Sequence, residues 1–352
     1  MIKREETYNG GPAIVLKALF LGLGMLVIMS PLSSQTLLTK EGKDDDDSYF
    51  VQYIGQFPSG EKKRTTGFFQ RIGKTVLGGE ALKPGKPVNI MAYDPGSFWI
   101  LDQGNGMVYR NNGGTLSLPK ALRRNRVSLS SLVGITADGD DEVLFTDSRE
   151  NKVFRLSAGG RELGVLNGNV ALDQPTGIAY SPVTGEIWVS ETGSHRIAVL
   201  DRRGELVRYI GRRGSAEGEF NFPTFIWIDA SGMAYIVDAM NFRIQIFDRY
   251  GKYASSFGEH GNATGYFARP KGVAVDSRGN IYVADALFNA VQIFDREGNF
   301  LYYFGSQGRG REQFWMPSGI FIDSDDYIYI ADSYNARIQI FQLKKGDLNA
   351  KN

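Results

Sequence analysis

The sequence predicts an all-β fold: a six-bladed β-propeller with four-stranded antiparallel blades, its ring closed by an N-terminal strand and preceded by an N-terminal apolar helix. Three observations predict this fold. An apolar strand that ends in an acidic residue recurs six times along the 352 residues. Each copy carries several short patterns of period two separated by turn residues. The last copy lacks one strand, which a segment near the N-terminus can supply.

The six recurring acids set the frame of the repeat. They follow one another at intervals of 44 to 47 residues and are Asp102, Asp147, Glu191, Asp238, Asp285 and Asp332. We interpret these blade acids as structural: each caps its own turn by accepting backbone N–H groups, as Asp commonly does. A ring of six carboxylates that binds a metal ion is the alternative, and we assign no metal ligands.

Four strands are predicted within each copy. The fifth copy shows them most clearly, at residues 272–276, 280–284, 291–294 and 300–304. The segments between them have turn compositions rich in Gly, Asp, Asn and Ser. Antiparallel four-stranded units repeated at this spacing are typical of propeller blades.

Ring closure follows from what the sixth copy lacks. Copies three to five end in a further strand before Gly211, Gly258 and Gly305, whereas the sixth stops near Gln342. The strand 49–55 is predicted to close the ring, with residues 68–73 as the competing choice. The propeller then spans 49–345, with an insertion at 56–81 that contains a short helix at 67–77, and a tail at 346–352.

The N-terminal part differs from the rest of the chain. Residues 1–34 contain a clean apolar stretch of twelve residues, Ala18–Met29, which is short for a membrane span and typical of a signal peptide. A retained signal anchor that uses residues 13–32, with Lys17 reaching the interface, is the alternative. Residues 35–48, with four consecutive aspartates, form an acidic linker. We expect an exported, periplasmic or extracellular protein.

The repeat resembles a known family. Its copies contain Pro-x-Gly, then Ile281-Tyr-Val-Ala-Asp285, then Asn241-x-Arg-Ile-Gln-Ile-Phe-Asp248, then Phe-Gly. This pattern is similar to the NHL repeat over residues 82–342, most closely in copies four to six. The stretch 49–80 resembles that of exported bacterial six-bladed propellers of the family. The resemblance implies a module that binds RNA or protein on its loop face.

Composition excludes several classes of function. Forty basic and 39 acidic residues give a net charge of +1, which argues against nucleic acid as a partner. There is no cysteine, so thiol chemistry and disulfides are excluded. The two histidines, His195 and His260, are too few for a three-histidine metal site, and we interpret them as ordinary loop residues. No cofactor and no catalytic residue is predicted.

A docking face is predicted beside the blade acids. The residue five positions after the acid is basic in four copies, and aromatic residues share the same loops; we assign binding to Lys152, Arg196, Arg243, Arg337, Phe242, Phe288 and Tyr334. Arginines with aromatic rings suit a protein, an anionic ligand or a peptide. Pairing of each basic residue with its own blade acid is the alternative.

The sequence therefore predicts a monomeric, non-catalytic binding scaffold, since a rigid disc holds its loops in fixed positions. A lyase or lactonase with a divalent metal in the central channel is the first alternative. A membrane-tethered structural subunit of an exported complex is the second.

Overall fold

The structure is a computed structural model that describes residues 37–38, 49–59, 82–125, 129–139 and 142–346. It divides into a unit of residues 51–344 and a small unit made of residues up to Phe50 and from Lys345 onward. Within the small unit, β1 (Leu37–Leu38) pairs antiparallel with Tyr49 and Phe50. The predicted signal segment, acidic linker and helix at 67–77, and the competing closure at 68–73, lie outside the described residues or largely so.

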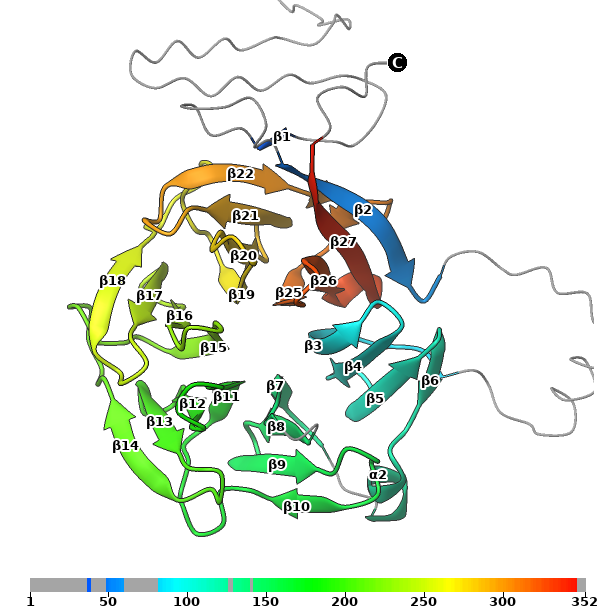
Figure 1. Ribbon diagram of the computed structural model, residues 1–352, viewed down its shortest axis with the longest axis vertical. Helices are drawn as coiled ribbons and strands as arrows, with labels where there is room; N and C mark the ends of the chain where they lie inside the picture. Colours follow the sequence, from blue (N-terminus) through cyan, green and yellow to red (C-terminus); the bar gives the residue numbers. More distant parts are fainter. Residues whose placement is uncertain (1–36, 39–48, 60–81, 126–128, 140–141, 347–352) are drawn as a thin grey trace, which may run out of the picture. The chain divides into compact units, whose positions relative to one another are not determined.

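Five four-stranded antiparallel sheets follow one another in the larger unit (Figure 1). Blade 1 contains β3 (Pro87–Asp94), β4 (Ser97–Asp102), β5 (Met107–Asn112) and β6 (Thr115–Ser117). Blade 2 contains β7 (Leu132–Ala137), β8 (Val143–Asp147), β9 (Lys152–Leu156) and β10 (Leu163–Val165). Blade 3 contains β11 (Pro175–Tyr180), β12 (Ile187–Glu191), β13 (Arg196–Leu200) and β14 (Leu206–Ile210). Blade 4 contains β15 (Pro223–Ile228), β16 (Ala234–Asp238), β17 (Arg243–Phe247) and β18 (Tyr253–Phe257), and blade 5 contains β19 (Pro270–Val275), β20 (Ile281–Asp285), β21 (Ala290–Phe294) and β22 (Phe300–Phe304).

Blade 6 draws on both ends of the sequence. Its strands are β25 (Pro317–Ile322), β26 (Tyr327–Asp332) and β27 (Arg337–Lys345), and β2 (Tyr49–Phe57) neighbours β27 in the sheet order. A short parallel pair, β23 (Ser306–Gln307) and β24 (Gln313–Phe314), and the 3-10 helix η1 (Ser333–Asn335) complete this region. The six-bladed, four-stranded antiparallel propeller that the sequence predicts is confirmed. Dependence of the ring on β2 stays a prediction.

The first strand of each blade lies closest to the central axis, as Figure 1 shows for β3, β7, β11, β15, β19 and β25. Glycine recurs on these strands because the neighbouring backbone approaches closely. A Cβ at Gly177 would overlap the carbonyl oxygen of Thr224, and one at Gly134 would overlap that of Thr176. Blades 1 and 4 depart from the pattern with Asn89 and Phe225, and both side chains are buried.

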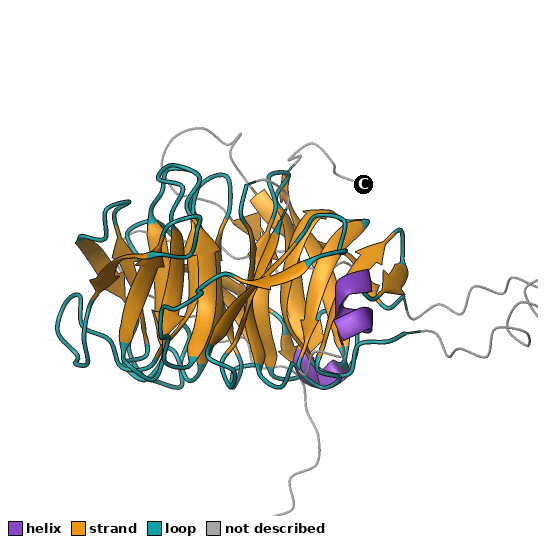
Figure 2. Cartoon of the chain, turned by 90° about the horizontal axis from the view of Figure 1, so that it is seen from below, coloured by secondary structure: helices purple, strands orange, loops and turns teal. Residues whose placement is uncertain are grey.

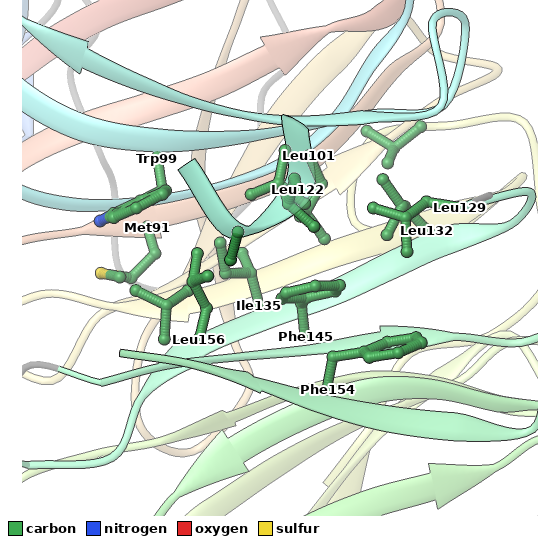
Figure 3. Packing of buried hydrophobic residues seen from close by; sticks show 14 residues of the cluster. Met91, Trp99, Leu101, Leu122, Leu129, Leu132, Ile135, Phe145, Phe154 and Leu156 are labelled. Carbon is green, nitrogen blue, oxygen red and sulfur yellow. The ribbon is translucent and has the colours of Figure 1, made fainter. Parts of the chain in front are cut away.

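Apolar clusters fill the space between adjacent blades. Figure 2 shows the blades themselves from the side. Figure 3 shows the cluster between blades 1 and 2, where Trp99, Phe145 and Leu156 pack together. The helix α2 (Lys120–Asn125) contributes Leu122 to this cluster. This helix was not predicted, because six residues with only two apolar side chains give little periodic signal.

The N-terminal strand is longer than the predicted 49–55. It continues to Phe57 because two side chains past Gly55 find partners. The Gln56 side-chain oxygen accepts a hydrogen bond from Arg337, and the Phe57 ring meets Phe98 edge-on at 5.6 Å. The insertion predicted to begin at residue 56 therefore begins after this strand.

Candidate binding site at the channel mouth

The blade acids close the end of each blade hairpin. All six side chains are fully buried. Asp285 accepts backbone N–H groups of Ala268, Arg269, Leu287 and Phe288. The other acids also accept a backbone N–H from the segment that enters their own blade, as from Gly85 to Asp102. Each carboxylate thus satisfies backbone donors, which is the structural role expected of it.

The basic position five residues later lies directly opposite the acid across the hairpin. Arg196 pairs with Glu191 at 2.6 Å, Arg243 with Asp238 at 2.9 Å and Arg337 with Asp332 at 2.7 Å. Only 9% of the Arg337 side chain and 14% of the Arg243 side chain are exposed. The guanidinium groups of Arg243 and Arg337 are therefore held within their blades, whereas 32% of the Arg196 side chain is exposed.

The other predicted docking residues lie in separate places. Lys152 begins β9 and is half-buried. The Phe242 ring lies against that of His260, with 4.4 Å between the centroids and a tilt of 57° between the planes. Phe288 borders a cavity at the rim of blade 5, and Tyr334 borders a different cavity on the axis. The structure therefore does not gather the seven residues into one surface.

His195 links two blades. It is buried, and its Nδ1 accepts the backbone N–H of Phe222 at 3.1 Å. Asn151 accepts from Gln174 and Asn289 from Met316 at the corresponding positions of blades 2 and 5. The histidine therefore serves as a repeated hydrogen-bond acceptor between consecutive blades.

A cavity of about 290 Å³, which we call the channel mouth, opens where the six inner strands begin. Each blade contributes the second residue of its innermost strand: Val88, Val133, Thr176, Thr224, Lys271 and Ser318. The ring of Phe225 borders this cavity and also a deeper one of about 110 Å³. In the deeper cavity Trp227 meets Phe321 edge-on at 5.4 Å, so large side chains fill the axis below the mouth.

Three cationic side chains, Lys86, Arg269 and Lys271, line the channel mouth. Among the described residues that border it, none is acidic. Burial, with smaller contributions from the neighbouring Arg269 and Lys86, lowers the pKa of Lys271 from 10.5 to about 8. Three like charges gathered without a counter-charge repel one another, and a bound anion would relieve that repulsion.

Aromatic side chains extend the site toward the rim. The Lys86 ammonium lies 5.1 Å from the centroid of the Tyr334 ring, and Trp315 lies 5.7 Å from the same ring. Arg309 stands over Trp315 at 5.0 Å. This alternation of cations and rings offers both stacking and charge to a ligand that enters the mouth.

Two further features bear on the alternatives. No group of three or more His, Asp or Glu residues in the described part of the chain is arranged to hold a metal ion. No helix within the described ranges is long and apolar enough to cross a membrane.

Sequence reasoning missed Lys86, Arg269 and Lys271. Arg269 and Lys271 flank Pro270 in copy five, and Lys86 precedes Pro87 in copy one as Arg269 precedes Pro270. The sequence does not show that these residues of two blades border one cavity. Comparing the residues on both sides of the position held by Pro270 across the six copies would have pointed to the axis, because the innermost strands begin there.

Comparison with known families identifies the repeat. Residues 172–200 match the NHL repeat, and residues 276–352 match a family described as a 6-bladed beta-propeller. With the observed blades, these matches confirm the NHL-repeat propeller that the sequence indicated. No curated protein gives a significant sequence match.

Solved structures share the fold at low identity. Virginiamycin B lyase from Staphylococcus aureus is 18% identical with a TM-score of 0.53, covering 75% of this chain and 98% of its own. An auxiliary nutrient binding protein from Bacteroides thetaiotaomicron is 15% identical with a TM-score of 0.59, covering 74% and 70%. A chain of the nidogen/laminin complex is 20% identical with a TM-score of 0.53, covering 70% and 86%. These likenesses show the fold alone.

Proposed function

We propose that this NHL-repeat propeller is an exported, non-catalytic binding protein whose channel mouth takes a carboxylate carried by a peptide ligand. The observation that carries the proposal is the convergence of Lys86, Arg269 and Lys271 on one cavity, with no acidic side chain among the described residues at its border. A carboxylate placed among them would accept charge-assisted hydrogen bonds, which are stronger than neutral ones.

The rest of the mouth fits a peptide. Apolar side chains such as Val88, Val133 and Phe225 border the cavity beside the cations. Small-molecule and peptide sites commonly combine such an apolar lining with a few converging polar groups. Tyr334 and Trp315 at the rim add rings against which a neighbouring peptide side chain can pack.

Binding is favoured over a lyase reaction by the contents of the mouth. A histidine-to-alanine variant of the S. aureus virginiamycin B lyase is catalytically inactive. In this chain neither His195 nor His260 borders the channel mouth. His195 accepts a hydrogen bond from the next blade, and the His260 ring lies against Phe242. Solved propellers of this fold also include nutrient binding proteins, which is consistent with a binding role.

Export is supported by the sequence of residues 1–34, with its charged start and short apolar stretch. Intact mass of the protein recovered from a bacterial host distinguishes the two forms of this proposal. A mass lacking the first residues indicates a cleaved signal, and the full mass in a membrane fraction indicates the anchored form.

Calorimetry with a matched pair of peptides tests the binding proposal. The probe is acetyl-Gly-Glu-Gly-amide, and its neutral control carries Gln in place of Glu. We expect saturable binding of the Glu peptide that weakens with salt, and loss of that binding in Lys271→Met. Lys252→Met, at an exposed turn of blade 4, is the matched control and should bind as the wild type does. Equal binding of both peptides, or unchanged binding by Lys271→Met, would exclude the carboxylate site.

A further inference from the structure

The three best-matched blades differ at one position of the repeat. Blades 4, 5 and 6 align at a constant offset of 47 residues, and the position opposite the blade acid is Arg243, Ala290 and Arg337. In blades 4 and 6 this arginine lies between the blade hairpin and the loop that enters the blade. Blade 5 has the same loop but an alanine, so its own guanidinium is missing from this place.

The arginine makes the same contacts in blades 4 and 6. In blade 4, Arg243 Nη2 donates to the carbonyl oxygens of Ala216 at 2.8 Å and Glu219 at 2.9 Å. In blade 6, Arg337 Nη2 donates to the carbonyl oxygens of Gly310 and Gln313, both at 2.7 Å. A pair of carbonyls three residues apart is thus a guanidinium receptor in each blade.

Blade 5 keeps the receptor. The equivalent carbonyls belong to Ala263 and Tyr266, and the Tyr266 N–H donates to the Ala263 oxygen just as Glu219 does to Ala216 in blade 4. The glutamine that hydrogen-bonds to the entering loop is also retained. Gln292 donates to the Tyr266 carbonyl oxygen at 2.7 Å and accepts from the Gly265 N–H at 2.8 Å. The loop backbone therefore has the conformation that receives a guanidinium in the other two blades.

A cavity of about 230 Å³ lies beside this place in blade 5. Its lining includes Ala263, Gln292, Phe288 and Tyr303, and none of the described residues that border it is cationic. Blade 4 has Asn241 and Ser256 where blade 5 has the two aromatic rings. The rings supply π-faces that attract a cation, and Tyr303 is 46% exposed and accessible from solvent.

We propose that this cavity, the blade-5 pocket, binds the guanidinium of an arginine side chain presented by a peptide partner. The partner's arginine takes the place that Arg243 and Arg337 occupy in their own blades. Backbone carbonyls accept hydrogen bonds from the planar guanidinium, and Phe288 and Tyr303 pack against its faces. Asp285 already accepts four backbone N–H groups, so the blade folds without the ligand and binding adds to a formed site.

Titration of the full chain with acetyl-Gly-Arg-Gly-amide, followed by NMR, tests this assignment. The control peptide carries citrulline, which has nearly the same shape without the charge. We expect saturable shifts from the arginine peptide and at least about tenfold weaker binding of the citrulline peptide, since charge-assisted hydrogen bonds are lost. Similar affinities for the two peptides, or no saturable shift with the arginine peptide, would overturn the assignment.

Variants locate the binding. Ala290→Arg provides the blade with its own guanidinium and should abolish binding of the peptide. Leu287→Arg, 56% exposed on the same loop, adds the same charge outside the pocket and should leave binding unchanged. If the larger side chain clashes with Phe288, the double variant Phe288→Asn with Ala290→Arg reproduces the residues of blade 4.

Tyr303→Ser places the blade-4 residue at the pocket edge and tests the site independently of position 290. We expect about two- to fivefold weaker binding through loss of one cation–π contact. Unchanged affinity in both Ala290→Arg and Tyr303→Ser would overturn the proposal. The Lys271→Met variant should bind this peptide normally, so failure here and failure of the channel-mouth proposal are separable.

Discussion

Replacing Arg337 by alanine should destabilise the propeller strongly, because this side chain joins three parts of blade 6. Its Nε donates to Asp332 at 2.7 Å, and its Nη1 donates to Gln56 on β2 at 2.8 Å. Its Nη2 donates to the carbonyls of Gly310 and Gln313. The blade acid, the N-terminal strand and the entering loop all lose a partner in the variant.

The size of the effect follows from burial. The Asp332 side chain is fully buried, and only 9% of Arg337 is exposed. Removing one partner of a buried ion pair leaves an uncompensated charge and typically costs about 3–5 kcal/mol. Arg337→Lys keeps a charge near Asp332 but loses the fork that reaches the carbonyls, so its cost should be intermediate.

Urea unfolding followed by tryptophan fluorescence measures the difference in the free energy of unfolding. Arg212→Ala is the control, since Arg212 is 82% exposed in its ion pair with Glu219 and its loss should have little effect. If Arg337→Ala unfolds at the same urea concentration as Arg212→Ala, the Arg337 guanidinium does not stabilise the fold. The docking role that the sequence predicts for Arg337 would then be favoured.

Three further outcomes are expected. Deleting residues 1–57 exposes the edge of β27. We expect aggregation, measured by light scattering, and a lower melting temperature, measured by circular dichroism. A monomeric and equally stable product would show that the ring closes without β2. His195→Asn should retain stability because asparagine fills this role in two other blades, whereas His195→Ala should cost about 1–2 kcal/mol in a thermal unfolding experiment by leaving the Phe222 N–H unpaired. The pKa of Lys271 is about 8 in the folded chain and 10.5 in the unfolded chain, so the folded chain binds fewer protons between these pH values. The free energy of unfolding should therefore rise with pH across that window. Lys271→Met should remove this rise, and an identical pH profile in the variant would refute the assignment.

The fold was largely predictable because every blade needs the same kinds of residue at the same positions of the repeat. An acid that ends the second strand caps backbone N–H groups in every blade, so Asp238, Asp285 and Asp332 recur at a fixed spacing. Glycine recurs where the backbones of inner strands meet, as at Gly177. Both constraints act within one blade or between neighbouring blades, so the same residues recur at a regular spacing in the sequence.

The candidate sites were less predictable because they arise from departures from the repeat. Lys271 replaces the small or apolar residue of other blades at the axis, and Ala290 replaces an arginine. Basic residues at the repeated position looked available for a partner in the sequence, yet Arg243 and Arg337 reach the loop carbonyls of their own blades. Only the three-dimensional arrangement distinguishes an arginine that builds a blade from a lysine that faces a cavity.

A crystal of the full chain soaked in selenate tests the binding proposal most directly. Selenate carries the charge of an oxyanion and can be located by its anomalous scattering. The account predicts a selenate peak in the channel mouth, within hydrogen-bonding distance of the Lys271 ammonium and near Lys86 and Arg269. Selenate bound elsewhere on the surface, with the channel mouth unoccupied at the same concentration, would contradict it.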